Sequence, residues 1–122
     1  MMKLMIVDDS NIIRTRIARL TVDSRLPLFQ IIGMAKNGLE ALSLAQRFQP
    51  KVVTMDLTMP EMDGITCVEK LCHLDPSMRI LVISALSDKT TAINALKKGA
   101  HGFLHKPFSD EQLVGGMLEL LR

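Results

Sequence analysis

The sequence predicts an α/β protein in which five helices cover a doubly wound, five-stranded parallel sheet. Two observations favour this class. Apolar runs of four residues recur along the chain, at 4–7, 52–55 and 80–83, as is typical of strands buried on both faces. Segments of helical length separate the runs, and strict alternation of strand and helix indicates parallel strands joined by right-handed crossovers. The length of 122 residues predicts one domain over residues 1–122.

Each strand is predicted from an apolar run and the turn residues beside it. The strands are expected at Lys3–Val7, Phe29–Met34, Val52–Met55, Arg79–Ile83 and, as a short segment, near Phe103. Asn37-Gly38 marks the turn after the second strand, and the loop Leu57–Asp63 with its Pro60 follows the third.

The helices are predicted from apolar residues at helical spacing. In order, their apolar faces are expected to hold Ile13, Ile17 and Leu20; Leu39, Leu42, Ala45 and Phe48; Ile65, Val68 and Leu71; Ile93 and Leu96; and Leu113, Met117 and Leu120. The fourth helix is expected to begin near Asp88 and to end at Lys97-Lys98-Gly99, because cations followed by glycine form a stop signal. The fifth opens with a capping box at Ser109–Gln112. Its Gly115-Gly116 pair predicts either close packing of Gly116 on the sheet or a helix loosened for a partner.

Composition excludes several classes of function. The net charge of +2 gives no argument for direct nucleic-acid binding, and no apolar stretch is long enough for membrane insertion. Cys67 and Cys72 lack partners at metal-ligand spacing, so we expect reduced thiols in a cytoplasmic protein.

Polar residues follow four of the predicted strands. Asp8 and Asp9 follow the first, Asp56 the third, Ser84 the fourth and Lys106 the fifth. Ligand chemistry in an open α/β sheet gathers at the carboxyl ends of the strands, so these side chains are expected in one crevice. Three carboxylates repel one another unless a cation lies between them, and oxygen ligands with room for water favour Mg²⁺. Asp56 could also attack phosphorus, with the Lys106 ammonium and the Ser84 hydroxyl balancing the added charge.

At these residues the sequence resembles the receiver domains of bacterial two-component response regulators. The matching stretches are Met5–Ser10, Met55–Gly64, Ser84-Ala85 and Lys106–Phe108. The resemblance implies a flavodoxin-like fold with strand order 2-1-3-4-5. It implies Asp56 as phosphoacceptor, and Mg²⁺ held by Asp8, Asp9, Asp56 and the backbone carbonyl of Thr58. It further implies Ser84 as the switch hydroxyl, Lys106 as the phosphate-pairing lysine and a cis Lys106-Pro107 peptide.

The resemblance also implies a phosphorylation-dependent switch rather than an enzyme with turnover. A histidine kinase or phosphotransfer protein would supply the phosphoryl group, and the face of helix 4, strand 5 and helix 5 would control a downstream protein partner, as in the similar chemotaxis regulators. Two positions depart from common versions of the pattern. Phe103, at the aromatic switch position, lacks a hydroxyl, and the apolar Leu86 overlooks the route of the hydrolytic water, so we expect slow self-dephosphorylation.

Three alternative functions share parts of this pattern. The stretch Thr54–Gly64 also resembles receivers fused to chemotaxis methylesterases. The sequence is therefore also compatible with a receiver domain cut from a longer regulator. An aspartate-nucleophile phosphatase is less favoured, because Asp8 and Asp9 are adjacent and the candidate nucleophile lies on the third strand. A flavin binder is disfavoured because two carboxylates after the first strand would repel the flavin phosphate.

Overall fold

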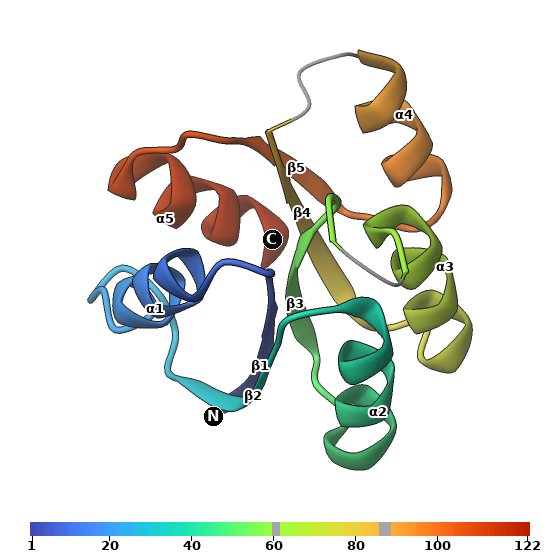
Figure 1. The fold of residues 1–122 in the computed structure, drawn as a ribbon. Coiled ribbons are helices and arrows are strands. Elements are labelled where there is room, and N and C mark those ends of the chain that lie inside the picture. Colours follow the sequence, from blue (N-terminus) through green and yellow to red (C-terminus); the bar gives the residue numbers. More distant parts are fainter. Residues whose placement is uncertain (60–61, 86–88) are drawn as a thin grey trace.

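The fold is a single five-stranded parallel sheet flanked by helices (Figure 1). A computed structural model describes residues 1–59, 62–85 and 89–122. The elements in chain order are β1 (Met2–Val7), α1 (Asn11–Leu20), β2 (Phe29–Ala35), α2 (Gly38–Phe48), β3 (Val52–Asp56), α3 (Gly64–Leu74), β4 (Arg79–Ser84), α4 (Lys89–Lys97), β5 (Gly102–His105) and α5 (Asp110–Leu120). The strand order is β2-β1-β3-β4-β5 and each pairing is parallel, which confirms the predicted fold.

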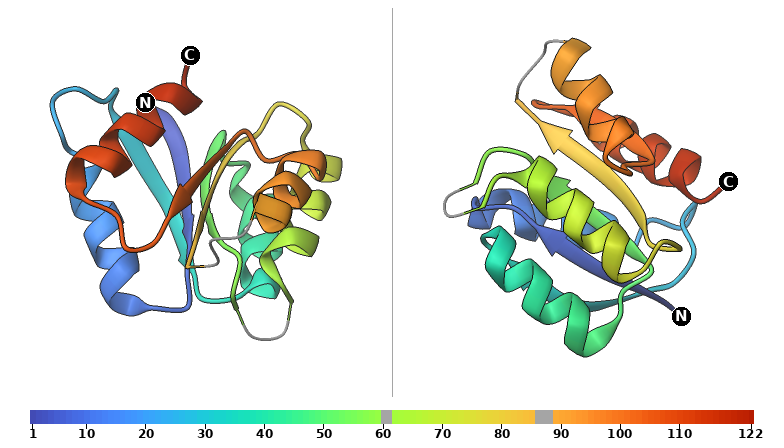
Figure 2. Two further views of the ribbon diagram at one scale, coloured as in Figure 1. Left: turned by 90° about the horizontal axis from the view of Figure 1, so that it is seen from above. Right: turned by 90° about the vertical axis from the view of Figure 1, so that its right-hand side faces the viewer.

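The sheet divides the interior into two halves. Figure 2 shows α1 and α5 on one face and α2, α3 and α4 on the other. Side chains from alternate strand positions fill the two sides: Ile6 and Val52 pack with α1 and α5, whereas Val53 and Met55 pack with the other three helices. β3 lies at the centre and all five of its residues are buried. No helix within the described ranges has the length and apolar character needed to cross a membrane.

Polar side chains cap the amino ends of four helices. The side-chain oxygen of each cap accepts a hydrogen bond from a backbone N–H in the first turn; the caps are Ser10, Asn37, Asp63 and Ser109. The predicted capping box of α5 is confirmed, because the Gln112 side chain also accepts from the Ser109 N–H. For α4, the expected start near Asp88 lies outside the described residues.

Two predicted helix faces are partly wrong. In α4, Ile93 and Leu96 are about half exposed and the buried residue is Ala95. In α2, Leu39 and Phe48 are exposed as well. The buried positions of α2 are Gly38, Ala41 and Ala45. Strand side chains already fill the interior, so close approach of a helix leaves room beneath it only for small residues.

The glycine pair of α5 does not show the tight packing that was one expectation. A Cβ on Gly116 would lie 3.5 Å from a methyl of Leu81, which is an ordinary contact. A Cβ on Gly115 would meet nothing within 4 Å. Gly116 therefore faces the sheet, but neither position requires glycine for space.

Candidate functional site

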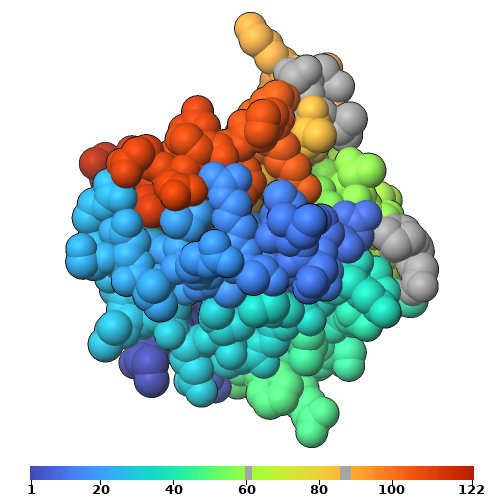
Figure 3. Space-filling model, turned by 60° about the vertical axis from the view of Figure 1, so that its left-hand side comes forward, coloured from blue at the N-terminus to red at the C-terminus, as the bar shows by residue number. Residues whose placement is uncertain are grey.

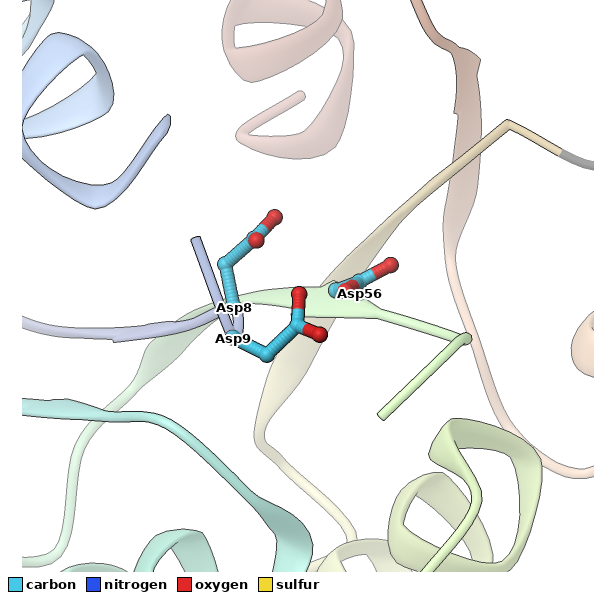
Figure 4. A group of neighbouring side chains, drawn as sticks. All are labelled: Asp8, Asp9 and Asp56. Atoms are coloured by element: carbon cyan, nitrogen blue, oxygen red, sulfur yellow. The ribbon is translucent and has the colours of Figure 1, made fainter. Parts of the chain in front are cut away.

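Three carboxylates converge at the carboxyl ends of the two central strands. Asp8 and Asp9 follow β1 and Asp56 ends β3, and the register of these strands sets Val7 opposite Met55. One carboxylate oxygen from each aspartate lies within 4.8 Å of the others. Figure 4 shows the three side chains projecting from these strand ends into a common space. Asp8 and Asp56 are buried whereas Asp9 is exposed, so the cluster opens to solvent beside Asp9.

The ammonium of Lys106 enters this cluster from the end of β5. Its Nζ donates to Asp8 Oδ2 at 2.9 Å and lies 3.5 Å from Asp56 Oδ1. The Lys106 backbone N–H donates to the Ser84 carbonyl at 2.8 Å, and the peptide to Pro107 is cis, as expected. Burial disfavours the ammonium, but the hydrogen bond to Asp8 and the charges of Asp56 and Asp8 outweigh it and raise the pKa of Lys106. The lysine is therefore a fixed positive charge at neutral pH.

The surroundings of Asp56 disfavour the charged form of its carboxyl group. Burial raises the pKa of its carboxyl to about 6, and the negative charges of Asp8 and Asp9 add to the rise. The Lys106 charge and the Thr58 N–H, which donates to Asp56 Oδ1 at 3.2 Å, act in the opposite direction but do not cancel it. One ammonium among three carboxylates thus leaves negative charge uncompensated.

Local backbone contacts hold the two buried aspartates in place. Asp8 Oδ1 accepts from the Ser10 N–H at 2.9 Å, and Arg14 Nη1 donates to the Asp8 carbonyl at 2.6 Å. Gly64 packs so closely against the Asp56 carbonyl and Leu57 Cα that any side chain there would collide with backbone. The Gly64 N–H also donates to the Leu57 carbonyl at 3.0 Å, which ties the start of α3 to the end of β3.

Of the other predicted site residues, the structure describes Ser84, Thr58 and Phe103. Ser84 is buried at the end of β4, one residue beyond Ile83, the partner of Asp56 in the sheet. Thr58 follows Asp56 by two residues and is exposed. Phe103 of β5 lies opposite Val82 of β4. Its side chain is partly buried and packs on the side of the sheet that α2, α3 and α4 cover. Leu86, expected near the hydrolytic water, lies outside the described residues.

Sequence reasoning missed two arginines of α1. Arg14 binds the Asp8 carbonyl, and Arg16 Nη2 donates to the Phe108 carbonyl at 2.7 Å. A weak signal was present: α1 has no acidic residue in its first turn, and Arg14 is a cation close to that turn. A cation near a helix amino end opposes the helix dipole, which suggests that a specific partner compensates it.

The donor set fits a hard divalent cation. Its ligands are carboxylate oxygens, its excess charge is negative, and the solvent-exposed Asp9 leaves one side open for water. Mg²⁺ favours sites that offer few protein ligands and leave room for several waters.

Comparisons with known proteins converge on one family. The family model for the response regulator receiver domain matches residues 4–117. The chemotaxis protein CheY of Listeria monocytogenes serovar 1/2a is 39% identical over 114 residues, covering 93% of each chain. Protein-glutamate methylesterase/protein-glutamine glutaminase 2 of Photobacterium profundum is 41% identical over 88% of this chain but 27% of its own length. A chain in the crystal structure of the CheX-CheY-BeF3-Mg complex from Borrelia burgdorferi is similar with a TM-score of 0.92 and 30% identity, covering 99% of this chain and 90% of that one.

Proposed function

Since the chain belongs to the family of response regulator receiver domains, we propose that it is a phosphorylation-dependent signalling switch with Asp56 as phosphoacceptor. The observation that carries this proposal is the convergence of Asp8, Asp9 and Asp56 with the Lys106 ammonium at one edge of the sheet. Asp56 is the only carboxylate on β3, and one of its oxygens would attack the incoming phosphorus.

The proposed reaction is a phosphoryl transfer to a carboxylate. An oxygen of ionised Asp56 forms a bond to phosphorus while the bond from phosphorus to the donor breaks, and the donor leaves with that electron pair. The donor would be a phosphohistidine on a kinase or phosphotransfer protein, or a small acyl phosphate. The product is an acyl phosphate on Asp56.

Charge around the product would be balanced by residues already in place. Asp8, Asp9, Asp56 and the Thr58 carbonyl would hold Mg²⁺, which when bound neutralises the carboxylates and the phosphoryl oxygens. Lys106 would exchange part of its contact with Asp8 for a phosphoryl oxygen. The Ser84 hydroxyl, at the end of the neighbouring strand, would donate to another.

We further propose that the output surface is formed by α4, β5 and α5. Lys106 follows β5 directly, Ser84 ends the strand paired with β5, and the Lys106 N–H joins the two. A change at the phosphoryl group would therefore reach this edge of the sheet. Ile93 and Leu96 lie half exposed on α4, where a protein partner could cover them.

A chemotaxis role in the cytoplasm is the pathway that we propose, because the chain matches nearly the full length of several proteins named CheY. The two free cysteines fit a reducing compartment. A receiver within a longer methylesterase is the second candidate, supported by the 41% identity to such a protein. The size of the native protein on an immunoblot of its source cell separates these two.

Mass spectrometry after incubation with acetyl phosphate and Mg²⁺ tests the acceptor. We expect one added phosphate on the wild type and none on Asp56→Asn. Asp63→Asn is the matched control: asparagine also caps helices, so this variant should be labelled normally. Unchanged labelling of Asp56→Asn would refute the assignment, and continuous consumption of excess phosphoester would favour the phosphatase alternative.

Amide chemical shifts test the output surface. Beryllofluoride with Mg²⁺ should shift amides of α4, β5 and α5 in the wild type, and Lys106→Ala should lose much of that response while still accepting phosphate on Asp56. Shifts confined to α1 in the wild type would contradict the proposed surface.

A further inference from the structure

The loop after β5 is attached to the site at one end and to α1 at the other. On the site side, the Lys106 N–H donates to the Ser84 carbonyl and the Lys106 ammonium to Asp8. Two residues later, Phe108 turns into the interior between α1 and α5, where it is 4% exposed. Pro107 stands between them with its φ angle restricted by its ring, so few backbone rotations separate the two residues.

Arg16 of α1 makes two contacts with Phe108 and one with Asp110. Its Nη2 donates to the Phe108 carbonyl at 2.7 Å and to Asp110 Oδ1 at 2.8 Å. Its guanidinium carbon also lies 4.5 Å from the centre of the Phe108 ring. The planar guanidinium can stack on a ring while donating in its own plane, which a lysine ammonium cannot reproduce.

The exposure of these contacts indicates that Arg16 does more to position the residues it touches than to stabilise the fold. The Arg16–Asp110 ion pair is partly exposed, at 33% and 65% for the two side chains, and exposed pairs add little stability. Figure 3 shows the surfaces of α1 and α5 in direct contact on this side of the molecule. A second link, between Arg25 and Glu111 at 2.7 Å, bridges to the same helix α5 without touching residues 106–108.

We propose that Arg16 is a positioning residue that sets the location of the Lys106 ammonium through Phe108. This inference rests on the proposed function, because the position of Lys106 matters when a phosphoryl group must be bound. With Arg16 replaced, Phe108 and the preceding backbone gain freedom, and Nζ no longer reaches its place over Asp8 and Asp56. Displacement of about 1 Å in such a group is enough to reduce function by one to two orders of magnitude.

The test separates a phosphoryl-specific effect from general loosening. In Arg16→Met, the affinity for beryllofluoride at saturating Mg²⁺ should fall about tenfold. The affinity for Mg²⁺ alone should not fall, because Lys106 contacts the phosphoryl group rather than the metal. Amide shifts report both affinities, since the chain contains no tryptophan or tyrosine for fluorescence.

Three further variants sharpen the result. Arg16→Lys should recover part of the beryllofluoride affinity through a hydrogen bond to the Phe108 carbonyl. Asp110→Ala removes the ion pair but keeps that hydrogen bond, so it should bind nearly as the wild type does. Arg25→Met, the matched control for an arginine link to α5, should be unchanged.

Two results would overturn the inference: wild-type beryllofluoride affinity in Arg16→Met, or equal losses for Mg²⁺ and beryllofluoride. Failure of the wild type to bind beryllofluoride would instead count against the proposed function. In that case, measurements on the metal-free protein test the inference about Arg16. There, Arg16→Met should shift the Lys106 and Phe108 amides and speed hydrogen exchange at the Lys106 N–H, with Arg25→Met leaving both unchanged.

Discussion

Replacing Asp56 by asparagine should make the metal-free protein more stable at neutral pH. The reason is the raised pKa of this buried carboxyl, about 6 in the folded protein against an ordinary value of 3.8. A folded state with the higher pKa binds the proton more tightly than the unfolded chain does. The stabilisation is therefore complete below the ordinary pKa and is lost as the pH rises through about 6.

The size of the effect follows from the same pKa values. Each unit of pKa difference corresponds to 1.36 kcal/mol, so a difference of about two units predicts a total loss of about 3 kcal/mol, of which about 2 kcal/mol falls between pH 4.5 and pH 7.5 because the unfolded carboxyl is already largely ionised at pH 4.5. The attraction of Lys106 is already contained in the folded pKa. Asparagine is neutral at both pH values and keeps an acceptor for the Thr58 N–H, so the variant should lack this loss.

Urea unfolding followed by far-ultraviolet circular dichroism, without Mg²⁺, measures the effect at pH 4.5 and 7.5. The difference between variant and wild type reports Asp56 together with its coupling to Lys106, because groups away from this cluster titrate alike in both. Glu119→Gln, at an exposed carboxylate of α5, is the control and should change stability little. Equal stability of Asp56→Asn and the wild type at pH 7.5, or a difference independent of pH, would refute the reasoning.

Three further substitutions are expected to have measurable effects. Asp9→Ala should weaken Mg²⁺ binding strongly by calorimetry, because it removes one of three clustered carboxylates; unchanged affinity would contradict the site. Thr54→Val should raise the unfolding free energy by about 1 kcal/mol, because Thr54 Oγ1 is buried without a hydrogen-bond partner in the described part of the chain; a loss in urea unfolding would mean that the hydroxyl is satisfied. Gly115→Ala should add up to about 1 kcal/mol, since a methyl there meets nothing; a lower melting temperature would argue against this view of α5.

The sequence predicted the strands better than the helix faces, and a physical reason explains the difference. A parallel strand such as Val52–Asp56 is apolar on both sides, so its run is visible without knowledge of its neighbours. Which side of a helix faces the sheet depends on how closely the helix packs. In α4 the small Ala95 is buried, whereas the larger Ile93 and Leu96 are about half exposed.

The candidate site shows the same contrast. The strand-end carboxylates could be predicted to converge because parallel strands end at one edge. Arg14 and Arg16 could not, since a long side chain can reach partners in several directions and only the packing of α1 decides among them. The closer approach of Lys106 Nζ to Asp8, at 2.9 Å, than to Asp56, at 3.5 Å, likewise depends on a small difference in side-chain position.

The separation of the interior by the sheet has a consequence for how such a protein can diversify. Phe108 and Ile17 belong to one half of the core, whereas the packing of α2, α3 and α4 belongs to the other. Substitutions that change the packing of one half can affect the opposite half only through the strands between them. Descendants of one ancestral chain could thus acquire new specificities on one flank, mutation by mutation, while inheriting the opposite flank almost unaltered.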